Sequence, residues 1–165
     1  MFYKLSLCLL FLIFLGNCNA SLTPTDCVFV DGPYKYDLTN LTGKTWSYSD
    51  GPDSVDYYFS ICGPSSICTN LNNNVPSSVC KITTNQFIEL GETSTGKFID
   101  NTIQGQGTIL RYFTTSTICS GLPTFVFINF DCQPGQPNIV TGVQDSNPCQ
   151  IQIYVSGESS CPFAN

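Results

Sequence analysis

The sequence contains no histidine, so it lacks the general base that most nucleophilic enzymes use. Neither a Ser-His nor a Cys-His catalytic pair can form, and no other nucleophile stands beside an evident activating base. Asp50 with Asp53 or Asp56 offers two carboxylates of the kind that glycosidases use, but solvated surface carboxylates are the commoner outcome for such a pair. The sequence therefore predicts that the protein is not an enzyme.

Positively charged residues are also scarce. Lys and Arg total 6 against 12 for Asp and Glu, which gives a net charge of -6. The basic residues form no cluster that would hold the phosphates of a nucleic acid or an anionic membrane surface. No nucleic-acid partner is expected.

Long apolar runs are missing beyond the first residues. Lys4 is followed by an apolar run over residues 5–15, and the next few residues end in Ala20, a small residue suited to cleavage. This is the pattern of a signal peptide, and a retained membrane anchor is the weaker alternative because a bilayer span needs roughly 20 apolar residues. We expect residues 1–20 to be a signal peptide and residues 21–165 to form one domain without a membrane span.

Eight cysteines follow Ala20, an even number that predicts disulfide bonds in an exported chain. A zinc site through Cys62 and Cys68 is the weaker interpretation, because the chain lacks paired CxxC motifs. No metal or other cofactor is expected. The eight residues are Cys27, Cys62, Cys68, Cys80, Cys119, Cys132, Cys149 and Cys161.

Apolar residues alternate with a period of two in several short segments, and no segment shows a convincing helical period. In residues 55–61 the odd positions are apolar, so this strand should bury one face and leave Asp56 and Ser60 in water. Ile151, Ile153 and Val155 repeat the pattern. The sequence predicts a mostly β fold.

Residues 125–128 are apolar on both faces, which predicts a strand buried between two layers, with residues 108–113 as a plausible neighbour. Clusters of Gly, Pro, Asn and Ser predict the connecting loops. These loops are residues 63–66, 70–78, 133–137 and 145–148.

Asn40, Leu41 and Thr42 form an N-glycosylation sequon, although such a triplet also occurs often by chance. In an exported chain the sequon predicts an exposed asparagine that carries a glycan. Asn40 is therefore the expected glycosylation site.

The order of the cysteines and the segments between them resemble a known family. The segments that carry the resemblance are residues 36–41, 57–62, 89–91, 130–132 and 149–153, together with the eight cysteines. With these features the chain resembles a single mannose 6-phosphate receptor homology domain over nearly all of residues 21–165. The resemblance implies a flattened β-barrel or sandwich of two crossed antiparallel sheets. It also implies four disulfides, which pair Cys27 with Cys62, Cys68 with Cys80, Cys119 with Cys149, and Cys132 with Cys161.

Sugar-binding members of that family hold mannose with a glutamine, an arginine, a glutamate and a tyrosine, and this chain departs from the set. The place of the glutamine falls near Asp50, and that of the arginine near Thr124. Among the counterparts of the glutamate, only Asp145 keeps a carboxylate, and the tyrosine is replaced by Ile151. Trp46 and Tyr48 complete the candidate ligand pocket, although most such residues are core or rim aromatics, which is the favoured interpretation of both.

Losing several hydrogen bonds, each worth about 1 kcal/mol, should remove most affinity for a simple sugar. A phosphomannose ligand is disfavoured further by the scarcity of basic residues. We expect a non-enzymatic binding protein of the secretory or endolysosomal pathway with a lectin-like scaffold, acting on a protein or glycoprotein partner or as a structural domain. The alternative is a divergent lectin that binds mannose-containing N-glycans through a non-standard pocket.

Overall fold

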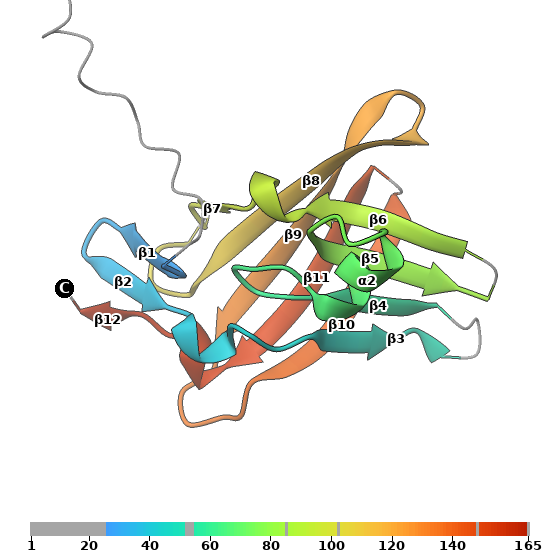
Figure 1. The fold of residues 1–165 in the computed structure, drawn as a ribbon. Coiled ribbons are helices and arrows are strands. Elements are labelled where there is room, and N and C mark those ends of the chain that lie inside the picture. Colours follow the sequence, from blue (N-terminus) through green and yellow to red (C-terminus); the bar gives the residue numbers. More distant parts are fainter. Residues whose placement is uncertain (1–25, 52–54, 85, 102, 148, 165) are drawn as a thin grey trace, which may run out of the picture.

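The computed structural model describes residues 26–51, 55–84, 86–101, 103–147 and 149–164. The expected signal peptide, residues 1–20, lies outside the described residues. The described part is a two-layer β-sandwich with a small third sheet at one end (Figure 1). The predicted all-β sandwich is therefore confirmed, and the described strands do not close into a barrel.

The larger layer is a five-stranded sheet, and the smaller layer is a four-stranded sheet that lies across it (Figure 1). In spatial order the larger sheet contains β10 (Ile139–Asn147), β11 (Gln150–Gly157), β9 (Leu122–Cys132), β8 (Gly107–Cys119) and β7 (Lys97–Ile99). The smaller sheet contains β3 (Trp46–Ser49), β4 (Asp56–Phe59), β5 (Ser77–Thr83) and β6 (Gln86–Glu92).

The third sheet joins the two ends of the described chain. Its strands are β1 (Val28–Asp31), β2 (Tyr34–Asp37) and β12 (Phe163–Ala164), with β2 in the middle. In the part of the chain that the structure describes, the strands are connected by the short helices η1 (Thr39–Leu41), α2 (Ser66–Leu71), η3 (Thr93–Thr95) and η4 (Glu158–Ser160).

The interior contains apolar side chains from both large sheets. The period-two pattern holds in β4, where Tyr57 and Phe59 are buried, and in β11, where Ile151, Ile153 and Val155 are buried. The other buried residues include Val79, Leu90, Leu110, Tyr112, Val126, Ile128 and Phe130. The two faces of β4 and of β11 therefore have the different environments that alternation requires.

Several local expectations are corrected. Ser60 was expected in water, but it is only 2% exposed, and its N–H donates to the Ser78 carbonyl at 2.9 Å. Residues 125–128 lie in β9 beside β8, as expected, yet only Val126 and Ile128 reach the core. Phe125 and Phe127 are half-buried on the opposite face. The strand is thus covered fully on one side only.

The sheet pairing is not antiparallel throughout, because β11 pairs with β9 in parallel, with Ile151 beside Val126 and Ile153 beside Ile128. The segment expected as a loop over residues 145–148 also differs: β10 continues to Asn147, and residue 148 is not described. Polar turn-forming residues thus extend an edge strand, where tertiary pairing overrides their local preference.

A short helix, α2, occupies the region in which the sequence predicted only loops. Its N-cap is Ser65, whose hydroxyl accepts a hydrogen bond from the Cys68 N–H at 3.4 Å. Six residues give fewer than two turns, too few for a helical period to be visible in the sequence. The predicted 70–78 loop shrinks accordingly, because α2 runs to Leu71 and β5 begins at Ser77.

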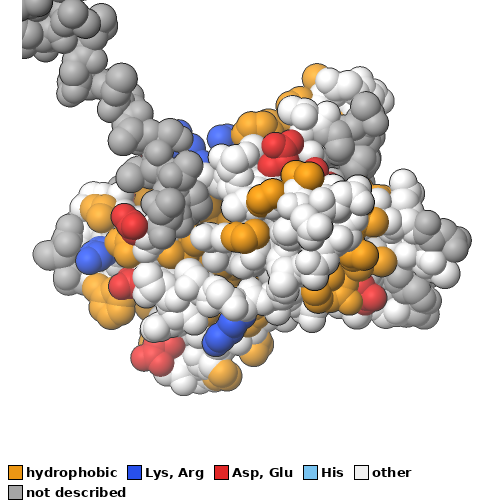
Figure 2. All heavy atoms as spheres, viewed as in Figure 1, with side chains coloured by type: hydrophobic (Ala, Val, Ile, Leu, Met, Phe, Trp, Pro, Cys, Tyr) orange, Lys and Arg blue, Asp and Glu red, His pale blue; other side chains and the backbone are white. Residues whose placement is uncertain are grey.

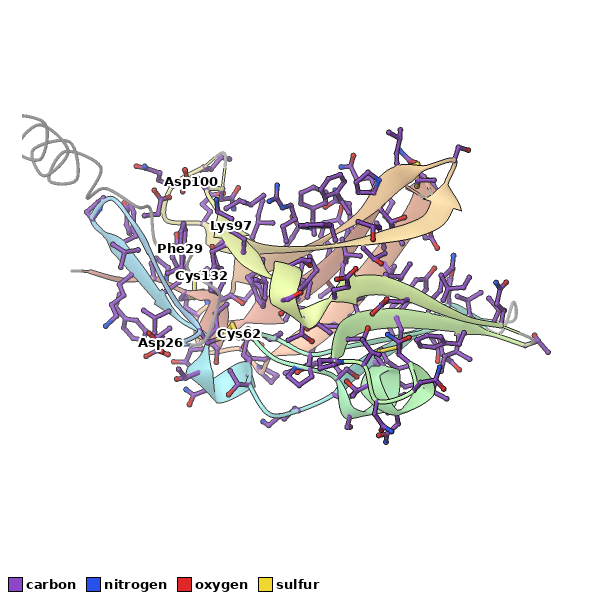
Figure 3. The ribbon with its side chains drawn as sticks, turned by 45° about the horizontal axis from the view of Figure 1, so that its top comes forward. Asp26, Phe29, Cys62, Lys97, Asp100 and Cys132 are labelled. Atoms are coloured by element: carbon purple, nitrogen blue, oxygen red, sulfur yellow. A yellow bond between two sulfur atoms is a disulfide. The ribbon has the colours of Figure 1, made fainter. Side chains whose placement is uncertain are left out.

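Four disulfides link Cys27 with Cys62, Cys68 with Cys80, Cys119 with Cys149, and Cys132 with Cys161. These are the pairs that the family resemblance implies. Two of them connect the small third sheet to the sandwich, because Cys27 precedes β1 and Cys161 precedes β12. Figure 3 shows Cys62 and Cys132 at this junction. Short terminal strands with little core of their own are thereby held in place.

Candidate ligand site at one end of the sandwich

A row of inward-facing side chains crosses the four-stranded sheet near one end. Tyr48 of β3 stands opposite Tyr57 of β4, Tyr57 opposite Lys81 of β5, and Lys81 opposite Ile88 of β6. Antiparallel partners share a face of the sheet, and Tyr57 is buried in the core. Lys81 therefore also points between the two sheets.

Asp145 of β10 meets this row from the other sheet. The Tyr57 hydroxyl donates to Asp145 Oδ2 at 2.6 Å, and Lys81 Nζ donates to the same oxygen at 2.7 Å. The side chains of Lys81 and Asp145 are only 19% and 15% exposed. The three residues thus form a mostly buried polar cluster that joins the sheets, which we call the Asp145 cluster.

The electrostatics of the cluster keep Tyr57 protonated. Burial raises the pKa of Tyr57, and the hydrogen bond to Asp145 together with the charges of Asp145 and Asp50 raises it further. At neutral pH Tyr57 is therefore a donor. Its proton and the Lys81 ammonium both serve Asp145 Oδ2, so the second oxygen of that carboxylate remains open to another donor within the described part of the chain.

Three of the six predicted pocket residues lie at this end. Asp145 belongs to the cluster, Tyr48 is the cross-strand partner of Tyr57, and Asp50 lies close enough for its charge to act on the Tyr57 hydroxyl. Asp50 is exposed, and its N–H donates to the Val55 carbonyl at 3.0 Å. The structure thus places one mostly buried and one exposed carboxylate around two tyrosines.

The other three predicted residues do not line such a pocket. Ile151 is 1% exposed and packs in the core, and Thr124 of β9 is fully buried. Trp46 packs against the core, and its indole N–H donates to the Leu41 carbonyl at 3.3 Å. Burial and hydrogen bonding inside the protein account for these side chains.

Lys81 and the hydroxyl of Tyr57 were not anticipated from the sequence. The alternation of residues 55–61 placed the Tyr57 ring inward, but it gave no sign that the hydroxyl reaches another sheet. Lys81 follows Cys80, and only the register of β4 with β5 turns its side chain inward. If the register of β4 with β5 were known in advance, the position of Lys81 opposite the inward-facing Tyr57 would predict an inward-facing lysine.

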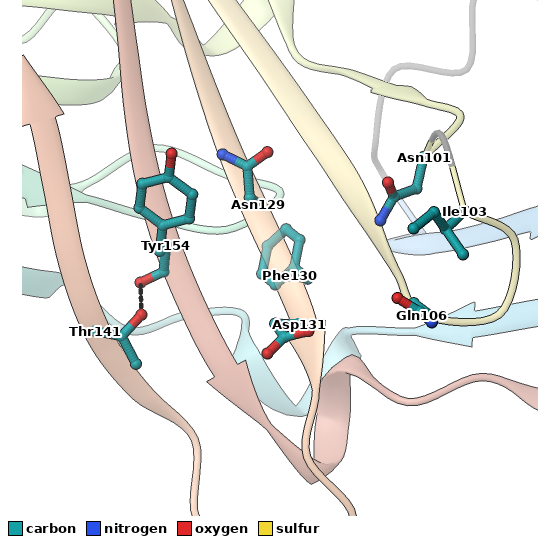
Figure 4. Close-up of a pocket in the computed structure, with 8 residues that line it drawn as sticks. All are labelled: Asn101, Ile103, Gln106, Asn129, Phe130, Asp131, Thr141 and Tyr154. Atoms are coloured by element: carbon teal, nitrogen blue, oxygen red, sulfur yellow. Dashed lines mark hydrogen bonds between the residues drawn. The ribbon is translucent and has the colours of Figure 1, made fainter.

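Two polar hollows lie on the outer face of the five-stranded sheet. The one in Figure 4 has a volume of about 310 Å³, and there the Thr141 hydroxyl donates to the Tyr154 carbonyl at 3.3 Å. A second, of about 270 Å³, is lined by Gln144, Ser146, Asn147, Gln150, Gln152 and Tyr154. Neither hollow includes a residue of the Asp145 cluster, which faces the interior.

The described surface has no concentration of one charge on the face drawn in Figure 2, where basic and acidic side chains are scattered among neutral ones. No helix among the described residues is long and apolar enough to cross a membrane. The four disulfides indicate an oxidising lumen or the extracellular space.

Comparison with known families decides the relationship that these features indicate. The profile of the cation-independent mannose-6-phosphate receptor repeat matches residues 15–120, more than half of the chain. The chain belongs to this family. Among curated proteins, none matches the chain by sequence. The fold described above is the lectin-like fold that the order of the cysteines predicted.

Among the solved structures that match, domain 11 of chicken IGF2R supports this assignment at the level of the fold. It superimposes with a TM-score of 0.59 at 14% identity, covering 84% of this chain and 93% of that domain. The mannose-bound MRH domain of glucosidase II beta gives 0.40 at 14% identity, covering 74% and 97%. The MRH domain of Yos9, in complex with alpha3,alpha6-Man5, gives 0.39 at 16% identity, covering 72% and 77%.

Proposed function

We propose that this repeat is a non-enzymatic binding protein of the secretory or endolysosomal pathway that uses its scaffold for protein interaction or for a structural role. Simple mannose is not its ligand. After removal of residues 1–20 as a signal peptide, residues 21–165 form the working domain. N-terminal sequencing of the secreted protein tests this cleavage, and retention of residue 1 contradicts it.

The Asp145 cluster is the observation that carries the proposal. In this chain the expected positions of the family's sugar ligands hold Thr124 and Ile151, which are buried. Asp145 keeps a carboxylate, but Tyr57 and Lys81 already bind one of its oxygens. A sugar would find only the second oxygen of Asp145 unpaired, and a single hydrogen bond yields little net free energy.

An outer surface supports the interaction role. On the face of β8 and β9 away from the core, Phe113 and Phe125 have ring centroids 5.9 Å apart, and Phe125 and Phe127 6.4 Å apart. The guanidinium carbon of Arg111 lies 5.7 Å from the centre of the Phe125 ring. Aromatic residues and arginine are enriched where proteins bind one another. We call these four residues the outer aromatic cluster.

A divergent lectin is the second candidate function, and the chemistry of the Asp145 cluster favours it. A carboxylate, an ammonium and two tyrosine hydroxyls gathered at one end of the sandwich are groups that hydrogen-bond sugar hydroxyls. The ligand would then be a mannose-containing N-glycan of a glycoprotein. The open oxygen of Asp145 would accept one of its hydroxyls.

One pair of measurements separates the two functions. The purified secreted protein is applied to an array of mannose-containing glycans, beside Tyr57→Phe, which keeps the ring but removes the hydroxyl. We expect no specific signal for simple mannosides. A signal that Tyr57→Phe weakens at least tenfold, with Lys97→Met as a control, would overturn the main proposal in favour of the lectin.

The interaction role has its own test. Partners are crosslinked to the secreted protein in the lumen of the secretory pathway and compared with those of Phe127→Ser, which alters the outer aromatic cluster. Ile139→Ser, at an apolar residue that is 51% exposed elsewhere, is the matched control. We expect loss of a reproducible crosslink in the first variant only, and equal crosslinking by both variants contradicts this use of the surface.

A further inference from the structure

Asn40 lies at the rim of a groove on the third sheet. It belongs to η1, directly after β2, and its side chain is exposed although the next residue, Leu41, is only 1% exposed. The groove has a volume of about 340 Å³ and Asn40 is part of its lining. The other lining residues are Asp37, Gly135, Gln136, Pro137, Asn138, Glu158, Ser159 and Phe163.

The walls of the groove come from three separate segments. They are η1 with the end of β2, the connection between β9 and β10, and η4 with β12, which Figure 1 shows together at one end of the molecule. The connection is held to η4 because Asn138 Nδ2 donates to the Ser159 hydroxyl at 3.0 Å and the Ser159 N–H donates to Asn138 Oδ1 at 3.1 Å. Two of the three wall segments are therefore fixed to one another by hydrogen bonds.

Phe163 is the apolar member of this polar groove. It is 61% exposed, although burial of an aromatic ring is strongly favourable. Its strand pairs with β2 through Phe163 and Lys35, which fixes the backbone of β12 beside β2. An exposed ring at the wall of a polar groove is suited to the apolar face of a sugar, whose hydroxyls then meet polar groups around it.

We propose that Asn40 carries an N-linked glycan whose first sugar residues lie in this groove against Phe163. The glycan is transferred from a lipid-pyrophosphate oligosaccharide donor: the bond from sugar C1 to Asn40 Nδ2 forms as the bond from C1 to the phosphate oxygen breaks. One amide proton leaves Nδ2, and the lipid pyrophosphate is the leaving group. The chain acts here as the acceptor and not as the enzyme.

The covalent bond to Asn40 favours the attached glycan over a free ligand as the occupant of the groove. A sugar attached to Asn40 starts at the rim of the groove, so its binding to Phe163 is intramolecular and needs little intrinsic affinity. The groove also carries the carboxylates of Asp37 and Glu158, which accept hydrogen bonds from sugar hydroxyls and repel an anionic ligand. A neutral N-acetylglucosamine fits this chemistry.

Occupancy is tested by peptide mass spectrometry on the protein secreted from a eukaryotic host. We expect the peptide that contains Asn40 to carry N-acetylhexosamine and hexose, and we expect PNGase F to release the glycan and leave an aspartate in place of the asparagine. Asn40→Gln and Thr42→Ala should each remove the glycan. An unmodified Asn40 peptide in the secreted wild-type protein overturns the proposal.

Packing against Phe163 is tested by a double-mutant cycle in thermal unfolding. Phe163→Leu keeps an apolar side chain but loses the ring. It should lower the Tm of the glycosylated protein by about 2–4 °C and should not change the Tm when it is combined with Asn40→Gln. An equal shift of Tm in both backgrounds means that the ring does not contact the sugar, and this overturns the placement in the groove.

A test without substitution of Phe163 guards against indirect effects. Endoglycosidase H, used on protein made with high-mannose glycans, leaves the first N-acetylglucosamine on Asn40, whereas PNGase F removes it. We expect the Tm to stay unchanged after endoglycosidase H and to fall after PNGase F. Asn40→Asp is the control for the charge that PNGase F introduces. Loss of Tm already after endoglycosidase H contradicts a role for the first sugar. The groove and the Asp145 cluster share no residue, so these results are independent of mannose binding.

Discussion

Lys81 Nζ lies 2.7 Å from Asp145 Oδ2, and this ion pair joins the four-stranded sheet to the five-stranded sheet at the end of an apolar interior. Both side chains have lost most of their contact with water, so each charge depends on the other. The pair contributes to the alignment of the sheets as well as to the chemistry of the candidate site.

Removing one partner should therefore be worse than removing both. Lys81→Met strands the Asp145 carboxylate and should lower the free energy of unfolding by about 2 kcal/mol, less than for a fully buried pair because both groups keep some exposure. Lys81→Met with Asp145→Asn should recover most of that loss, because both charges are gone and the amide oxygen still accepts from the Tyr57 hydroxyl. Urea unfolding measures both variants, with exposed Lys97→Met as the control, and additive losses in the double variant would show that the charges act independently.

Gly91 should not tolerate a larger residue. A Cβ added there would stand 2.7 Å from Tyr112 Cβ, closer than two carbons approach in folded proteins. Gly91→Ala should therefore lower the free energy of unfolding by about 1–3 kcal/mol through overpacking between β6 and β8. Gly142→Ala in β10 is the matched control, because a Cβ there meets nothing within 4 Å. Equal unfolding midpoints in urea for the two variants would refute the close approach.

The fold was largely predictable because its strands differ on their two faces. The alternation around Tyr57 and around Ile153 identified inward residues, and the structure buries both. The parallel pairing of β11 with β9 was not predictable, since pairing direction depends on contacts distant in sequence. The same holds for α2, whose six residues are held by Ser65 and by the disulfide from Cys68 to Cys80.

The candidate site was predictable only in part. The family resemblance directed attention to Asp50 and Asp145, and these do lie near Tyr57. The resemblance did not identify Lys81, because the inward direction of the lysine side chain follows from strand register and not from residue type. The hydrogen bonds from Tyr57 and Lys81 to Asp145 connect two different sheets, so they can be recognised only once the arrangement of the two sheets is known.

The disulfides should differ in their contributions to stability according to the loops that they close. Cys27 and Cys62 are separated by 35 residues, and Cys68 and Cys80 by 12. Loop entropy alone predicts that replacing the first pair by serines costs about 1 kcal/mol more than replacing the second. Chemical unfolding of the two double variants measures the difference. A reversed order would show that strain or residual structure outweighs chain entropy.

Loss of the Cys132–Cys161 bridge should have a local effect. This bridge fixes the segment that leads into β12, which has only the short pairing with β2 to hold it. Cys132→Ser with Cys161→Ser should make the C-terminal segment sensitive to protease while the core strands stay protected. Hydrogen exchange followed by mass spectrometry resolves the two regions, and uniform loss of protection would show that the whole fold depends on this bridge.

Glu89 should make stability depend on pH in a direction that its burial determines. Burial raises the pKa of Glu89, the nearby charge of Glu92 raises it further, and a hydrogen bond from Ser77 opposes both. Because its pKa is raised in the folded state, the contribution of Glu89 to stability is fully present below the unfolded pKa. It is lost as pH rises through the folded pKa.

Glu89→Gln should therefore raise the Tm at neutral pH, where the half-buried carboxylate is otherwise charged. The new amide oxygen retains an acceptor for Asn72 Nδ2, which lies 2.9 Å from Glu89 Oε1. The gain should shrink as pH falls through the raised pKa of folded Glu89 and be gone below the unfolded pKa of 4.5, because Glu89 of the wild-type protein is then mostly neutral in both states. Thermal unfolding of both proteins between about pH 3.5 and 7.5 measures the difference, with exposed Glu158→Gln as the control. A gain that stays constant with pH would mean that the amide acts through packing, because only a change in ionisation makes the two curves converge in acid.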